Sequence, residues 1–203
     1  MKALFACALL LLSACATIPA ENLELARKVE NDVGARLARL DQPSPQQLLR
    51  KEHVYRISHA SWGRNFGTIT LQVLGDGEGL LTVVSGTSGQ NGWRQLNRTE
   101  FVKKRLSHDV MRQFEKLVEI SRFWERGAPL NGYSACPPAR TVDEELECIV
   151  IHTDGGDLWL EAARYHDYQA ISDTHTYSGA DTSHYHTGRV ALIVDAIYRL
   201  KRG

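Results

Sequence analysis

The stretch Thr68-Ile69-Thr70-Leu71-Gln72-Val73-Leu74-Gly75-Asp76-Gly77-Glu78-Gly79 decides the fold. Its apolar residues alternate with polar ones up to Val73, which is the pattern of a strand with one buried face. The glycine-rich turn that follows predicts a next strand that runs back antiparallel. Two further glycine clusters divide the region in the same way. We therefore expect an antiparallel meander of consecutive strands near 53–62, 68–74, 80–85 and 93–105.

Helical patterns precede this meander. Residues 21–41 carry alanine, valine and leucine at helical spacing among charged residues, which predicts an N-terminal amphipathic helix. Ser44-Pro45-Gln46-Gln47 has the form of a capping box with proline at the first helical position. We expect a short helix from there to about Glu52.

A helix, further strands and a last helix follow the meander. Ser107 is expected to begin a helix that continues toward Trp124, and an apolar stripe at 190–198 predicts a C-terminal helix. Strands are expected between them, at 148–152, 158–163 and 165–171. Because strands and helices do not alternate regularly, the order indicates an α+β domain. We expect an antiparallel meander sheet covered on one face by helices, with the other face as the binding surface.

The first residues have the features of an export signal. Lys2 carries a positive charge, and residues 3–12 form an apolar run that is too short for a transmembrane helix, which needs about 20 residues. The stretch Leu12-Ser13-Ala14-Cys15 then resembles the lipobox of bacterial lipoproteins. The resemblance implies removal of residues 1–14 as a signal peptide and acylation of Cys15, which would anchor the chain in a lipid bilayer. The alternative is a secretory signal cut after Ala14 or Ala16, which would leave a soluble protein.

Ala16 bears on the location. Many bacterial lipoproteins that stay in the inner membrane have an aspartate at this position, so the resemblance implies an anchor in the outer membrane that faces the periplasm. We expect a cell-envelope protein with a signal peptide at 1–14, a tether with the N-terminal helices at 15–52 and a single α+β domain at 53–203.

A looser resemblance extends over the mature domain. It is carried by the glycine-punctuated strands and by Ser121-Arg122-Phe123-Trp124, Asp154-Gly155, Leu158-Trp159-Leu160-Glu161 and Tyr165-His166. These features are similar to an uncharacterised small α+β domain of bacterial envelope proteins. The resemblance implies no activity.

Charge and cysteines narrow the possible partners. The chain has 24 basic and 24 acidic residues, so loss of Lys2 with the signal leaves one net negative charge. This balance argues against a nucleic-acid partner, which a basic domain would bind.

Cys7 leaves with the signal and Cys15 takes the lipid, so Cys136 and Cys148 remain. In an oxidising compartment this pair predicts a disulfide worth about 3 kcal/mol.

Two clusters of residues are candidate sites. A polar stretch near the C-terminus offers ligands for zinc or copper, although ordinary solvated loops have the same composition. Its candidate ligands are His175, Asp181, His184 and His186. The second cluster lies on a predicted hairpin and combines aromatic residues, an acid and a histidine, which suit a sugar or a peptide but also ordinary cross-strand packing. Its members are Trp159, Glu161, Tyr165 and His166.

No catalytic motif stands out. The loop at 85–92 lacks the spacing of a phosphate-binding loop or a nucleophile elbow. The interpretation that we favour is a non-catalytic binding module for a protein, peptide or glycan partner, without a cofactor. One alternative is a hydrolase with zinc on the C-terminal histidines and Asp181 or Glu161 as the base. Another is an inhibitor or immunity-type protein.

Overall fold

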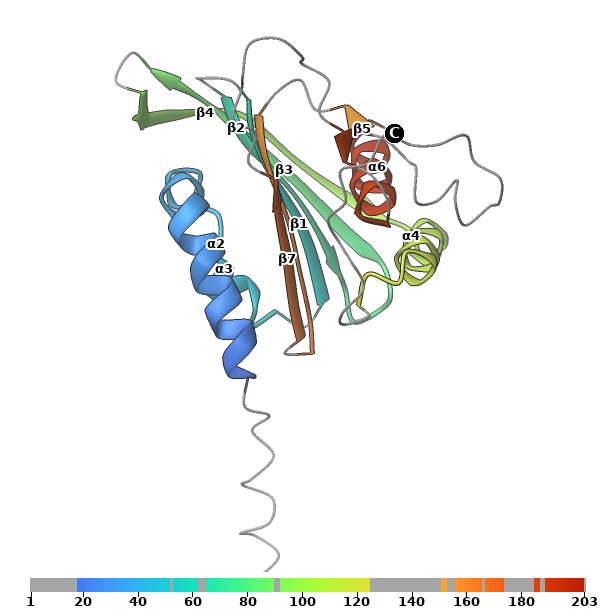
Figure 1. Cartoon of the computed structure of the whole chain (residues 1–203). Coiled ribbons are helices and arrows are strands. Elements are labelled where there is room, and N and C mark those ends of the chain that lie inside the picture. The colour runs from blue at the N-terminus through green and yellow to red at the C-terminus, as the bar shows by residue number, and fades with distance from the viewer. Residues whose placement is uncertain are drawn as a thin grey trace, which may run out of the picture.

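The computed structural model describes residues 18–51, 53–61, 65–89, 92–124, 151–152, 156–165, 167–173, 185–186 and 189–202. A six-stranded antiparallel sheet forms its centre, in the order β4-β3-β2-β1-β6-β7 (Figure 1). The strands are β1 (His53–Ser61), β2 (Asn65–Val73), β3 (Gly79–Gly89), β4 (Gly92–Leu106), β6 (Gly156–Arg164) and β7 (Asp167–Asp173). A separate two-stranded sheet pairs β5 (Ile151–His152) with β8 (Tyr185–His186).

The helices are α2 (Ala20–Arg39), α3 (Pro45–Leu48), α4 (His108–Ile120) and α6 (Arg189–Arg202). The capping box predicted at Ser44 is present, because its hydroxyl accepts from the Gln47 backbone and the Gln47 side chain accepts from the Ser44 backbone. The short helix ends earlier than expected, at Leu48. Among the described residues, no helix has both the length and the apolar character to cross a bilayer.

The β2–β3 turn explains why the meander forms where the sequence predicts it. The Leu74 backbone donates to the Glu78 carbonyl oxygen over 2.8 Å, and the Asp76 carboxylate accepts from the Glu78 backbone over 3.0 Å. Gly77 has a φ of +80°, a conformation that a residue with a Cβ adopts only with strain. The turn therefore sends β3 back along β2, and the α+β class with its antiparallel meander is confirmed.

The order of the strands has one long connection. β1 to β4 are neighbours in chain order, and β6 then returns to pair with β1 on the opposite side from β2. The hairpin of β6 and β7 extends the sheet from there. This return places residues about one hundred positions apart on adjacent strands, such as Arg56 opposite Glu161.

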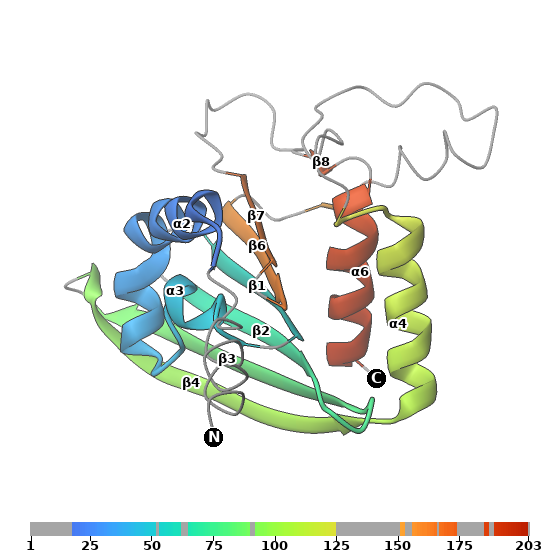
Figure 2. The ribbon, with the colours of Figure 1, turned by 90° about the horizontal axis from the view of Figure 1, so that it is seen from below.

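Helices cover both faces of the sheet, which differs from the expected single covered face (Figure 2). On one face, α4 and α6 pack over Tyr55, Ile57 and their neighbours to form the main apolar core. On the other face, the apolar stripe of α2 packs against Phe66 and Trp159, and α3 extends this layer. The amphipathic helix that the sequence assigns to the tether is therefore part of the fold, because its stripe gains burial on the sheet.

Candidate functional site

The predicted pair of Trp159 and Glu161 shares one face of β6, as expected, but that face is not accessible. The two residues are 2% and 0% exposed, because α2 and the segment between α2 and α3 lie over them. The expectation of an open binding surface at this pair is therefore corrected. A fully buried carboxylate is also poorly placed to act as the base of a hydrolase.

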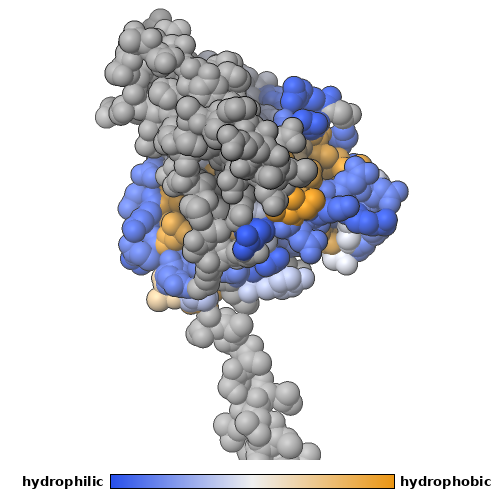
Figure 3. Space-filling view, turned by 45° about the vertical axis from the view of Figure 1, so that its right-hand side comes forward, coloured by the Kyte–Doolittle hydropathy of each residue, from blue (hydrophilic) through white to orange (hydrophobic). Residues whose placement is uncertain are grey.

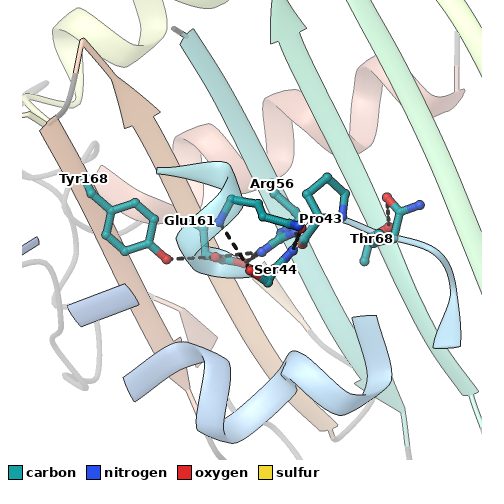
Figure 4. A network of polar contacts seen from close by, with 8 residues as sticks. Pro43, Ser44, Arg56, Thr68, Glu161 and Tyr168 are labelled. Carbon is teal, nitrogen blue, oxygen red and sulfur yellow. Dashed lines mark hydrogen bonds and ion pairs between the residues drawn. The ribbon is translucent and has the colours of Figure 1, made fainter. Parts of the chain in front are cut away.

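Glu161 belongs to a sealed polar cluster (Figure 4). The Arg56 guanidinium donates to both carboxylate oxygens of Glu161 over 2.8 Å, and the Tyr168 hydroxyl donates to Oε1 over 2.8 Å. Arg56 also donates to the carbonyl oxygen of Pro43, between α2 and α3. Burial, followed by the charge of Glu161, raises the pKa of Tyr168, which keeps its phenol protonated. The cluster thus fastens the α2–α3 connection to the sheet.

Tyr165 lies away from this pair. It occupies the turn between β6 and β7 with a φ of 48°, and it is 75% exposed. Its predicted partner His166 lies outside the described residues. The structure therefore does not bring Tyr165 together with Trp159 and Glu161.

The remaining predicted sites fall largely outside the described residues. These are Cys15, Cys136, Cys148, His175, Asp181 and His184. His186 is described only as a backbone position in β8. Within the part of the chain that the structure describes, no three histidine, cysteine or acidic residues are grouped so as to hold a metal ion. The disulfide and the zinc site thus stay predictions.

A cavity of about 640 Å³ lies beside α4, on the face opposite the sealed cluster. Two carboxylates, Glu115 and Glu119, contribute to its lining. They are outnumbered by four cationic side chains, Arg112, Lys116, Arg122 and Arg164. Figure 3 turns the side of α4 and α6 forward and shows hydrophilic residues around smaller hydrophobic areas. We call this cavity the α4 pocket.

Aromatic rings form one wall of the α4 pocket. The Arg164 guanidinium lies over the Trp124 ring, 4.5 Å from its centroid, in a cation–π contact. Phe123 packs edge-on against Trp124 with 5.1 Å between the ring centroids, and Tyr55 lies 6.2 Å from Trp124. A guanidinium that lies over an aromatic ring can still donate hydrogen bonds from its edge, and carboxylates and phosphates match that donor pattern.

A polar chain runs behind the pocket from β1 to α4. His53 Nε2 lies 3.0 Å from the Tyr55 hydroxyl oxygen, and that hydroxyl donates to Glu115 Oε2 over 3.5 Å. A second contact of 3.5 Å joins His53 Nε2 to Glu115 Oε1. An ionised Glu115 carboxylate can only accept, so the Tyr55 hydroxyl uses its proton to donate to it. The Tyr55 oxygen must then accept from His53, which places the imidazole proton on Nε2.

Burial controls the protonation of this chain. It lowers the pKa of His53 to about 4, with a further contribution from the charge of Arg164, so the imidazole is neutral at pH 7. Burial also raises the pKa of Glu115 and of Tyr55. The fixed positive charge beside the pocket therefore comes from arginine and lysine rather than from histidine.

Both comparisons with known proteins are negative. No protein-family model matches the chain, and a search of curated proteins finds no similar sequence. The function must therefore be argued from the geometry of the site, since a fold alone does not determine activity.

Sequence reasoning missed the α4 pocket, although one signal was present. Arg112 and Lys116 stand four residues apart on α4, where like charges repel each other and cost a few tenths of a kcal/mol. Arg112 is paired with Asp109 on the same helix, so this basic pair was only a weak signal of an anion site. Arg112 and Lys116 share the pocket with Arg164 only because β6 returns to pair with β1, and no local sequence pattern shows this return.

Proposed function

We propose that the chain is a lipid-anchored protein of the cell envelope that works as a non-catalytic binding module, and that the α4 pocket receives an anionic group of its partner. The observation that carries this proposal is the Arg164 guanidinium stacked on Trp124 in a cavity with three more cationic side chains. The location rests on the lipobox-like segment that ends at Cys15.

The chemistry of the pocket favours carboxylates and phosphates. A guanidinium offers parallel N–H donors that match the two oxygens of such a group. An anion at this position is attracted by the four cationic side chains of the lining, which outnumber its two carboxylates. Partners with accessible carboxylates or phosphates, whether protein, peptide or glycan, are therefore preferred over neutral ones.

The surroundings of the pocket support binding rather than catalysis. The phenol of Tyr55 is 0% exposed, and burial raises its pKa, so it does not ionise readily. Both Glu161 oxygens accept hydrogen bonds inside the sealed cluster on the other face. An inhibitor or immunity-type protein is one form of such a binder, and copurification of one tight partner would distinguish it.

The test measures anion binding to the acylated full-length protein in neutral detergent. The probes are inorganic phosphate and tetraglutamate, titrated by calorimetry into the wild type and into Arg164→Gln. We expect binding of at least one probe, weakened about tenfold or more by the substitution, because a charged hydrogen bond is worth roughly 1.5–3 kcal/mol.

Lys103→Gln is the matched control, since it removes one positive charge from an exposed position on β4. It is expected to leave the affinity unchanged. Equal weakening by both substitutions, or no binding of either probe, would refute the proposed site.

A further inference from the structure

The chain enters the fold at the end of the sheet where the α4 pocket lies. Ile18, the first described residue, packs against an apolar cluster that contains Val54 and Ala163. These two residues are cross-strand partners, and the next pair along the ladder is His53 with Arg164. Arg164 lines the pocket. Figure 1 shows the beginning of α2 at the same end of the molecule as the turn between β6 and β7.

The length of the chain limits how far this end can lie from the predicted anchor. Three peptide steps separate Ile18 from Cys15, and they span at most about 11 Å when fully extended. An acylated Cys15 would hold its sulfur at the boundary between the acyl chains and the headgroups. This end of the sheet would then lie within reach of the headgroup layer.

Exposed apolar side chains at this end are of the kind that membrane interfaces accept. Tyr165 follows Arg164 directly, is 75% exposed and has its ring 6.4 Å from that of His53. Leu23, near the start of α2, is 37% exposed. Tyrosine is enriched at the headgroup level because its ring is apolar and its hydroxyl is polar.

We infer that the α4 pocket binds the phosphate of an anionic phospholipid in the leaflet that carries the acylated Cys15. This inference rests on the proposed function and names its partner. The tether keeps the pocket close to the headgroups, so their effective concentration at the pocket is high. A lipid phosphate can therefore occupy the pocket in competition with soluble anions even if each contact is weak. Such a contact fixes the orientation of the domain on the membrane.

The experiment uses the acylated full-length protein in nanodiscs and follows amide hydrogen exchange in α4 and residues 121–124. One set of nanodiscs contains phosphatidylcholine alone, and the other contains phosphatidylcholine and phosphatidylglycerol at about two to one. We expect exchange to slow by about threefold or more with phosphatidylglycerol, because a bound ligand suppresses opening in proportion to its occupancy.

Two variants separate the pocket from general attraction to a charged surface. In Lys116→Gln with Arg164→Gln, the slowing is expected to disappear, whereas Lys103→Gln should retain it. Thermal unfolding of each variant checks that the fold is kept. Equal slowing in the pocket variant and in the control, or none in the wild type, would overturn the inference.

Inorganic phosphate added to the phosphatidylcholine nanodiscs distinguishes the two sources of phosphate. If it slows exchange as much as phosphatidylglycerol does, the ligand is a free anion and only the inference fails. If phosphatidylglycerol has no effect while tetraglutamate binds in detergent, the proposed function stands with a different partner. If no anion acts in either experiment, both proposals fail.

Discussion

Arginine, glutamate and tyrosine come together twice in this protein, on opposite faces of the sheet. Arg56, Glu161 and Tyr168 form the sealed cluster under α2 and α3, where the charged side chains are 0% exposed and the polar contacts are 2.6–2.8 Å long. On the other face, Tyr55 and Glu115 are 3.5 Å apart beside the α4 pocket.

The comparison shows that the same residue types stabilise the fold where they are buried and are placed for ligand binding where they line a cavity. In the sealed cluster every charge is paired, so removal of one partner strands the other in a medium of low polarity. Beside the pocket, the Arg164 guanidinium lies over the Trp124 ring, its charge opposes the burial that raises the pKa of Glu115, and three further cationic side chains line the same cavity. The predictions below test this contrast, from the largest expected effect to the smallest.

The sealed cluster should dominate stability. Glu161→Ala is expected to lower the free energy of unfolding by about 3–5 kcal/mol, because the buried Arg56 loses its counter-charge. Chemical denaturation measures the loss. Replacement of both residues, Arg56→Met with Glu161→Leu, should cost much less, since no charge is stranded. A loss below about 1 kcal/mol for Glu161→Ala would show that the cluster is not a structural fastening.

Helix α2 should contribute to the stability of the fold as a core element. Leu37→Ala on α2 is expected to cost about 2–4 kcal/mol, because Leu37 is 0% exposed and leaves a cavity against the sheet. Leu23→Ala, at a partly exposed position of the same helix, is the control and should cost far less. Equal and small losses in denaturation would mean that α2 is only a tether.

Acid should weaken the fold through His53. Its pKa is about 4 in the folded protein against 6.5 in the unfolded chain, so the unfolded chain takes up the proton first as the pH falls. Stability present above pH 6.5 is therefore lost toward pH 4, by roughly 2 kcal/mol at about pH 4.5.

The raised pKa of Glu115 acts in the opposite direction, so the informative quantity is the difference between wild type and His53→Asn. Unfolding measured at pH 7 and at about pH 4.5 should show a smaller acid loss in the variant. Identical losses in the two proteins would contradict the assignment of a buried neutral imidazole.

The pocket itself should matter least to stability. Arg164→Lys keeps the charge but removes the planar donor pair, so we expect it to weaken tetraglutamate or phosphate binding several-fold at a cost in unfolding free energy of about 1 kcal/mol or less. Calorimetric titration and denaturation measure the two effects. Unchanged affinity would mean that charge alone, rather than a held guanidinium, attracts the ligand.

Much of the fold was predictable because its signals are local. The alternation at 68–73, the glycine turn and the Ser44 capping box each depend on a few neighbouring residues, and all three are confirmed. The placement of α2 was not predictable in this way, since an apolar stripe indicates burial but does not say against which surface. Because the sequence does not show that α2 packs over β6, we expected an open face at Trp159 and Glu161.

The sequence by itself determined the antiparallel meander and the approximate positions of the helices, because short-range sterics and hydrophobic periodicity act within a few residues. Only the tertiary structure decided which charges are sealed and which line a pocket. Arg56 and Glu161 are 105 positions apart, and Arg164 is separated from its ladder partner His53 by a similarly long stretch of chain. These pairs meet because β6 returns to β1, and that register is set by the packing of the whole sheet.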